Sequence, residues 1–199
     1  MRLCLLLLVS ILPSLAAFAD DPVREGSIFL VASRELSDPF FRQTVVLVTH
    51  RAGPAPVGVI INRPTGIALS RVVPGLDKPP AQEAKVFFGG PVNPEGLLVV
   101  FRDGTKPEDA IEVLEGVYLS SGKEALREVL SRDKPVKGLR VFAGYAAWAP
   151  GQLEAEIARG DWHLVRADAG AIFGSKPEAL WPELERRASA KPVGARLGL

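Results

Sequence analysis

The stretch 44–49 (TVVLVT), followed by 56–62 (PVGVIIN), decides how this chain folds. β-Branched residues dominate both segments, and such residues favour extended strands. The short connection between the segments contains Gly53 and Pro54, which predicts an antiparallel hairpin. The first half of the chain is therefore expected to be mainly sheet.

Apolar runs and helical periodicity elsewhere predict the remaining elements. Further strands are expected at 27–32, 85–88, 97–101, 117–119, 139–147 and 162–166. The pair at 85–88 and 97–101 flanks glycine, proline and asparagine residues, which predicts a second hairpin with a longer loop. Helices are expected at 122–131, 152–159 and 177–187, the last with a break or kink at Pro182. Neighbouring strands followed by helices predict an α+β fold, a single domain with a largely antiparallel sheet and helices concentrated in the second half.

The first 19 residues have the pattern of a cleavable signal peptide. Arg2 precedes an almost unbroken apolar run at 3–12, and Ala17-Phe18-Ala19 matches the small-x-small pattern of a signal peptidase site. A membrane anchor is the competing interpretation, but a spanning helix needs about 20 apolar residues and this run is shorter. We therefore expect a signal peptide at 1–19, a folded domain at 20–187 and a flexible C-terminal tail at 188–199, with the mature protein periplasmic or secreted and without a stable membrane span.

Charge and cysteine content narrow the functional classes. The chain has 24 Lys and Arg against 23 Asp and Glu, and loss of Arg2 with the leader makes the remainder formally neutral. A neutral domain has no long-range field to attract nucleic acid, so no nucleic-acid partner is expected. The single cysteine, Cys4, lies in the leader, which leaves no thiolate nucleophile or sulfur ligand in the domain.

Five segments, in this order and spacing, resemble the bacterial AlgH/YqgE family. They are GSIFLVAS (26–33), SDPFF (37–41), GVIINRP (58–64), FFGGPV (87–92) and GYAAWAPGQLE (144–154). The resemblance extends over about 26–184. Ala147 and Ala149 depart from it, because the family usually has glycine there. The resemblance implies a single α+β domain without an established enzymatic activity, loosely associated with transcriptional regulation. A protein exported from the cytoplasm cannot act on chromosomal DNA.

The segments that carry the resemblance also supply the candidate site. Arg63 could bind a carboxylate or phosphate and Asn62 could orient a ligand, or both could serve the local backbone. Gly89 and Gly90 could hold an anion on their amides, or form only a turn before Pro91. The predicted ligand-binding residues are Phe41, Asn62, Arg63, Gly89, Gly90, Tyr145 and Gln152.

Aromatic residues in two of these segments bear on the same site. In an extended segment at most one of Phe40 and Phe41 points into the core, which leaves the other for the surface. Tyr145 is expected to be partly exposed, whereas Trp148 is expected to seal the core. If the segments mark a function, the side chains of Asn62, Tyr145 and Gln152 should converge on one concavity.

No catalytic or metal-binding pattern is recognisable. The two histidines, His50 and His163, have no H-x-x-H spacing, and no G-x-S-x-G motif accompanies them. No phosphate loop or dinucleotide fingerprint occurs, so we predict no catalytic residues, no metal and no cofactor. The sequence favours a non-catalytic binding, accessory or regulatory protein of the cell envelope, with an unknown protein or small-molecule partner. The alternative is a hydrolase with an unrecognised site that uses His50 or His163.

Overall fold

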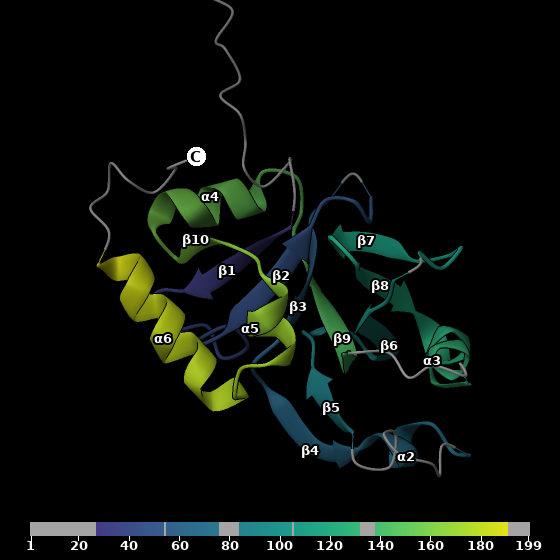
Figure 1. The fold of residues 1–199 in the computed structure, drawn as a ribbon. Coiled ribbons are helices and arrows are strands. Elements are labelled where there is room, and N and C mark those ends of the chain that lie inside the picture. Colours follow the sequence, from purple (N-terminus) through teal and green to yellow (C-terminus); the bar gives the residue numbers. More distant parts are fainter. Residues whose placement is uncertain (1–26, 54, 76–83, 105, 132–137, 191–199) are drawn as a thin grey trace, which may run out of the picture.

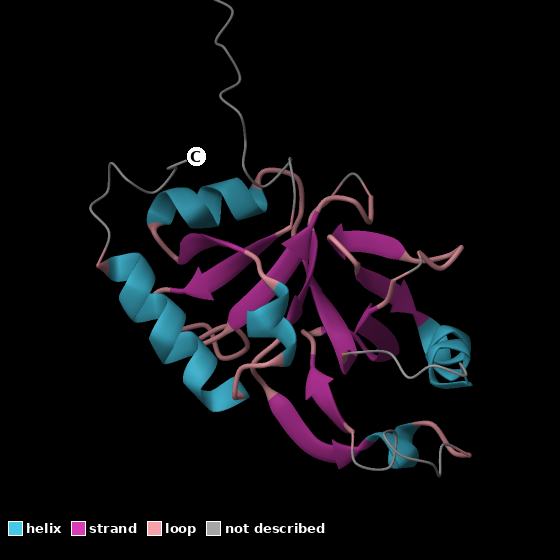
Figure 2. Cartoon of the chain, viewed as in Figure 1, coloured by secondary structure: helices cyan, strands magenta, loops and turns pink. Residues whose placement is uncertain are grey.

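The strands form one strongly curled sheet with helices on both of its faces (Figure 2). The computed structural model describes residues 27–190, except 54, 76–83, 105 and 132–137. The predicted signal peptide lies outside this range. The strands are β1 (Ile28–Ala32), β2 (Val45–Thr49), β3 (Val57–Ile60), β4 (Pro64–Ala68), β5 (Lys85–Phe88), β6 (Val92–Arg102), β7 (Ile111–Leu114), β8 (Val117–Ser121), β9 (Leu139–Ala147) and β10 (Trp162–Arg166). The helices are α2 (Leu69–Val72), α3 (Gly122–Ser131), α4 (Gln152–Arg159), α5 (Ala169–Phe173) and α6 (Pro177–Ser189).

The strand order is β10-β1-β2-β3-β9-β6-β8-β7, and β4 extends the sheet through β5 beside β9 (Figure 1). Every paired edge is antiparallel except that between β5 and β9. With four of the five described helices after β8, the α+β class, the single domain and the largely antiparallel sheet are confirmed. The predicted hairpin is also confirmed, because β2 pairs with β3 from Val46 opposite Ile60 to Thr49 opposite Val57.

Side chains alternate between the two faces of the sheet and build separate cores. On β1, Phe29 and Val31 enter one core, which α5 and α6 cover, while Leu30 enters another, which α4 covers. A third core lies under α2 and α3, where Leu126 and Val129 pack against β6 and β9. A sheet buried on both faces in this way needs the nearly continuous apolar strands that the sequence shows.

The predicted second hairpin is wrong. β5 and β6 do not pair with each other, because β9 lies between them. The segment Val141–Ala143 of β9 runs parallel to Val86–Phe88 of β5, and its other edge pairs antiparallel with β6. The glycine-rich connection therefore carries the chain across β9 and does not turn it back on itself.

The final helix also differs from expectation. α6 runs without a break from Pro177 to Ser189, two residues beyond its predicted end, although Pro182 lies inside it. Proline removes one backbone hydrogen bond from a helix. The apolar face formed by Leu180 and Leu184, both buried against the sheet, stabilises the helix across that defect. Of the predicted break or kink at Pro182, the break is wrong. The predicted tail at 188–199 begins with two helical residues, and 191–199 lie outside the described range.

Candidate functional site

Asn62 and Arg63 hold the segment that connects β1 to β2. The side-chain oxygen of Asn62 accepts a hydrogen bond from the backbone N–H of Val45 (2.9 Å), and its side-chain nitrogen donates to the backbone carbonyl of Gln43 (3.0 Å). The Arg63 guanidinium donates to the Phe40 carbonyl (2.6 Å) and the Arg42 carbonyl (2.9 Å). We call residues 37–43 the aromatic loop.

The aromatic loop is also stabilised from within. The Asp38 carboxylate accepts hydrogen bonds from the amides of Phe40 (2.8 Å) and Phe41 (3.0 Å), which is the local bonding expected of an Asp before a turn. The Thr44 hydroxyl donates to the Phe41 carbonyl (2.7 Å). At its end, Gln43 takes a positive φ of 57°, a conformation that costs free energy in a residue with a Cβ. Side-chain hydrogen bonds therefore fix this loop although it contains no helix or strand.

The two phenylalanines of the aromatic loop point in different directions. Phe41 is half-buried and contacts the rings of Trp148 (centroids 6.3 Å apart) and Trp162 (5.8 Å). Phe40 is 47% exposed and stacks on Phe88, with centroids 6.2 Å apart and planes at 24°. Only one of the pair enters the core, as the sequence predicts, so Phe41 anchors the loop and Phe40 faces solvent.

Gln152 belongs to the support of this aromatic cluster. Its carbonyl oxygen accepts from the Ala149 amide (3.1 Å), and its amide nitrogen donates to Glu156 (2.9 Å). The other Glu156 oxygen accepts from the indole nitrogens of Trp148 and Trp162, both at 2.9 Å. Trp148 lies in the core as expected. The sequence does not single out Glu156, because its i, i+4 spacing from Gln152 predicts a contact within the helix but not the hydrogen bonds to the two indoles.

Gly89 and Gly90 lie where the chain crosses β9. A Cβ on Gly89 would collide with the Gly144 carbonyl, and a Cβ on Gly90 would collide with the Tyr145 backbone. The Gly89 amide donates to the Ala143 carbonyl (2.8 Å), and its carbonyl accepts from the Ile60 amide (2.9 Å). Close passage of two backbones is therefore the structural reason for both glycines.

Tyr145 is half-buried, as predicted, but it lies on the other face of the sheet. It packs against the core that α5 and α6 cover, whereas Phe41 packs against the core under α4. Side chains along a strand normally alternate between the two faces of a sheet. Gly144 in β9 has a positive φ (71°), which interrupts this alternation. Phe142 and Tyr145, three residues apart, therefore both face the core under α5 and α6.

The structure therefore brings together part of the predicted set. Phe41, Asn62 and Arg63 meet in or on the aromatic loop, and Gly89 follows Phe88, on which Phe40 stacks. Gln152 joins them through Glu156, and Tyr145 stands apart. Ligand binding by these residues remains a prediction.

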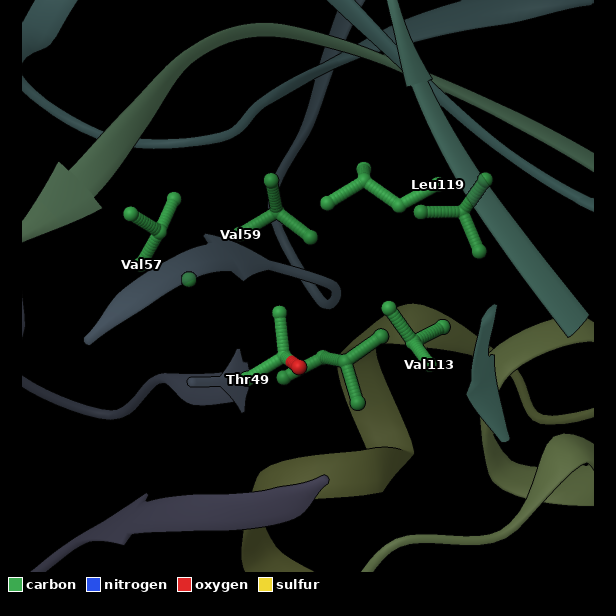
Figure 3. A pocket seen from close by; sticks show the side chains of 8 residues that line it. Thr49, Val57, Val59, Val113 and Leu119 are labelled. Carbon is green, nitrogen blue, oxygen red and sulfur yellow. The ribbon is translucent and has the colours of Figure 1, made fainter. Parts of the chain in front are cut away.

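A small cavity inside the curl of the sheet contains none of these residues (Figure 3). It has room for about 10 Å³, the space of one water molecule. Its lining is apolar apart from one threonine and consists of Leu47, Thr49, Val57, Gly58, Val59, Val100, Val113 and Leu119. This cavity is too small for a substrate.

His50 does not complete a catalytic triad in the described contacts. His50 follows β2 and its buried Nε2 has no hydrogen-bond partner, whereas Asp38 precedes β2 and already accepts two amides. His50 Nε2 therefore has no bond to a serine hydroxyl, and both Asp38 bonds go to backbone amides, so these contacts do not form a Ser-His-Asp triad. Within the described ranges, no cluster of three His, Cys, Asp or Glu residues could hold a metal ion, and no helix is long and apolar enough to cross a membrane.

One buried charged group lies on α6. The Glu185 side chain is 2% exposed and accepts hydrogen bonds from Arg34 (2.7 Å) and from the Ser189 hydroxyl (2.8 Å). The Arg34 hydrogen bond is the main reason that the pKa of Glu185 lies below its usual value, and His163 contributes weakly in the same direction. This pair links α6 to the start of the β1–β2 connection. The Ser189 hydroxyl donates to a carboxylate here, whereas the serine of a catalytic triad donates to a histidine.

Comparison with known proteins places this architecture in a family. A family model described as AlgH-like matches residues 29–193. A UPF0301 protein of Myxococcus xanthus is 35% identical over 172 residues, covering 85% of this chain and 93% of that protein. A UPF0301 protein of Streptomyces avermitilis is 37% identical over 163 residues, covering 79% and 83%.

Two solved structures are similar in fold. The solution structure of the AlgH protein from Pseudomonas aeruginosa has a TM-score of 0.69 at 24% identity, covering 90% of this chain and 96% of that chain. The crystal structure of protein DIP2367 from Corynebacterium diphtheriae has a TM-score of 0.67 at 26% identity, covering 87% and 90%. On the extent of the family match and the identity of these relatives, the chain belongs to the AlgH-like family.

Proposed function

We propose that this AlgH-like protein is a non-catalytic binding or accessory protein of the cell envelope, and that it binds its partner through the aromatic loop. The envelope location rests on the signal-peptide pattern at 1–19. The lack of catalysis rests on the site itself, where the polar side chains hold the backbone in place and form no acid–base pair.

The observation that carries the proposal is the exposure of Phe40 on a loop fixed by side chains. Arg63, Asn62 and Asp38 together make six hydrogen bonds to backbone groups within or adjoining this loop. Fixing a loop before binding lowers the entropy that association would otherwise cost. Exposed aromatic side chains held in this way are typical anchors of protein interfaces.

Nucleic acid is not the proposed partner. The chain without its leader is formally neutral, and the release of counterions by basic side chains supplies most non-specific affinity for nucleic acid. A salt-sensitive, sub-micromolar complex with duplex DNA in a gel-shift assay would contradict this part of the proposal.

A photo-crosslinking experiment tests both location and binding. p-Benzoylphenylalanine replaces Phe40 in one variant and Ile67 in the control, since Ile67 is the other exposed large apolar residue in the described part of the chain, at 46%. After irradiation of intact cells, we expect the periplasmic fraction to contain a mature chain beginning after Ala19, with crosslinked products only from position 40. An intact Met1 in the cytoplasm, or the same products from both positions, would overturn the proposal.

A hydrolase remains the second candidate because His50 Nε2 is buried without a partner. A screen against ester, phosphoester and peptide substrates separates the two functions. We expect no turnover. Turnover that His50→Ala or His163→Ala abolishes would establish the hydrolase instead.

A further inference from the structure

Two arginines are associated with the part of the aromatic loop that carries Phe40. Arg63 donates to the Phe40 carbonyl, and Arg42 follows two residues after Phe40 with its side chain in solvent. Burial, and to a smaller extent the positive charge of Arg42, lower the pKa of Arg63. Within the described part of the chain, neither Arg42 nor Arg63 forms an ion pair with a carboxylate.

The neighbouring charged groups make their hydrogen bonds elsewhere and do not pair with these two arginines. Arg34 bonds to the buried Glu185, and Asp38 is occupied by two backbone amides. Arg63 uses one N–H on each of two carbonyls, whereas a guanidinium carries five N–H groups. This part of the surface therefore combines an exposed aromatic ring with two arginines that have no carboxylate partner among the described residues.

We propose that Phe40, Arg42 and Arg63 bind an acidic peptide segment of a partner protein, in which a large apolar side chain stands next to carboxylates. The apolar side chain packs against the free face of Phe40, and the carboxylates neutralise the two guanidinium groups. This inference rests on the proposed function and names the chemical class of the partner.

The chemistry of the surface favours a peptide over a nucleic acid. Aromatic and arginine side chains also bind single-stranded nucleic acid, but such sites follow a positively charged groove along the backbone. Here Glu35 and Asp38 precede Phe40 in the same connection, so the positive charge of Arg42 and Arg63 is local and does not extend along a groove. A carboxylate matches the fork of a guanidinium and needs only a local contact.

Amide chemical-shift perturbation measures the weak affinity expected of a short probe. The full mature chain, labelled with ¹⁵N, is titrated with an acetylated and amidated Gly-Asp-Phe-Asp-Gly peptide, with Gly-Lys-Phe-Lys-Gly and Gly-Asp-Ala-Asp-Gly peptides, and with a thymidine oligonucleotide. Of the four probes, we expect only the Asp-Phe-Asp peptide to shift the amide resonances of residues 37–43. Its binding should weaken as the salt concentration rises from about 0.05 M to about 0.5 M.

Matched variants connect the binding to the named side chains. Phe40→Ala should weaken binding of the Asp-Phe-Asp peptide about tenfold, and Arg42→Glu should weaken it about threefold or more. Ile67→Ala and Arg166→Glu change exposed residues elsewhere and should leave the binding of this peptide unchanged. Amide spectra that retain the native dispersion establish that each variant is folded.

The outcomes distinguish the two proposals. Equal binding of the Lys-Phe-Lys and Asp-Phe-Asp peptides at residues 37–43 would overturn the acidic partner and leave the binding function standing. Shifts caused only by the oligonucleotide would replace the peptide with nucleic acid. No shift at 37–43 with any probe would overturn the inference, while crosslinking from position 40 would still support the proposed function.

Discussion

Gly90 and Tyr145 lie in direct backbone contact, at the point where the chain passes from β5 across β9 to β6. Gly90 has a φ of 154°, and a Cβ there would strike the Tyr145 carbonyl group and the Ala146 amide. Gly144 faces the same crossing from the other strand, where a Cβ would strike the Gly90 carbonyl. The crossing can form only because these positions lack side chains.

Gly90→Ala should therefore destabilise the protein by about 3 kcal/mol or more, because the methyl group has no space and the backbone must shift. Urea unfolding monitored by circular dichroism measures the loss. Gly53→Ala is the matched control, since a Cβ there meets nothing within 4 Å, and it should change stability by less than about 0.5 kcal/mol. Equal stability of the two variants would mean that the crossing is not tightly packed.

Arg63→Lys should loosen the aromatic loop. A lysine ammonium cannot bridge the Phe40 and Arg42 carbonyls as the planar guanidinium does, so one strong hydrogen bond is lost. We expect the amides of residues 40–43 to exchange with solvent about tenfold faster, a change worth about 1.4 kcal/mol. Hydrogen-exchange mass spectrometry measures it. Arg42→Lys, at an exposed side chain, should leave the exchange unchanged, and equal acceleration in both variants would contradict the role given to Arg63.

Glu156→Ala should lower the free energy of unfolding by about 2–4 kcal/mol, because the indole N–H groups of Trp148 and Trp162 would lose their acceptor. Both indoles are buried, so water cannot replace the carboxylate without opening the core. Glu156→Gln retains one acceptor oxygen and should lose less. Thermal unfolding followed by tryptophan fluorescence measures the series, with exposed Glu154→Ala on the same helix as the control. A loss no larger than that of the control would show that the carboxylate does not stabilise the tryptophan pair.

The contribution of Glu185 should depend on pH. Its pKa is lower in the folded protein, first through the Arg34 hydrogen bond, so the native state binds fewer protons there than the unfolded chain. The stabilisation is present above the unfolded pKa of about 4.3 and is lost as the pH falls through the lower folded pKa.

Urea unfolding between about pH 6 and pH 3 should therefore show the wild type losing stability faster than Glu185→Gln as the pH drops below about 4. Exposed Glu183→Gln should follow the wild-type profile, since a surface ion pair contributes little. Parallel profiles for the wild type and Glu185→Gln would contradict the lowered pKa.

Local pattern in the sequence was sufficient for most elements. The strand at 139–147 and the helices at 122–131 and 152–159 have the predicted bounds, because periodicity and turn residues act over a few neighbours. The short elements β4, β7, α2 and α5 were not predicted. Each has only four or five residues, too few for a period to show.

Long-range pairing was decided by the tertiary structure. Residues 85–88 and 97–101 look like a hairpin in sequence, yet β9, which starts at Leu139, lies between them. A strand edge can pair with any compatible edge, so its partner depends on how all the apolar faces are buried together.

The candidate site divides in the same way. By itself, the sequence determined that a turn follows β1, that one of Phe40 and Phe41 faces outward, and that Asn62 and Arg63 end a strand. Only the tertiary structure decided that Arg63 bonds the Phe40 carbonyl, that Glu156 joins two tryptophans 14 residues apart, and that Tyr145 faces the opposite core. Hydrogen bonds and ring contacts join groups that folding brings together from distant parts of the chain, and no local pattern records which groups will meet.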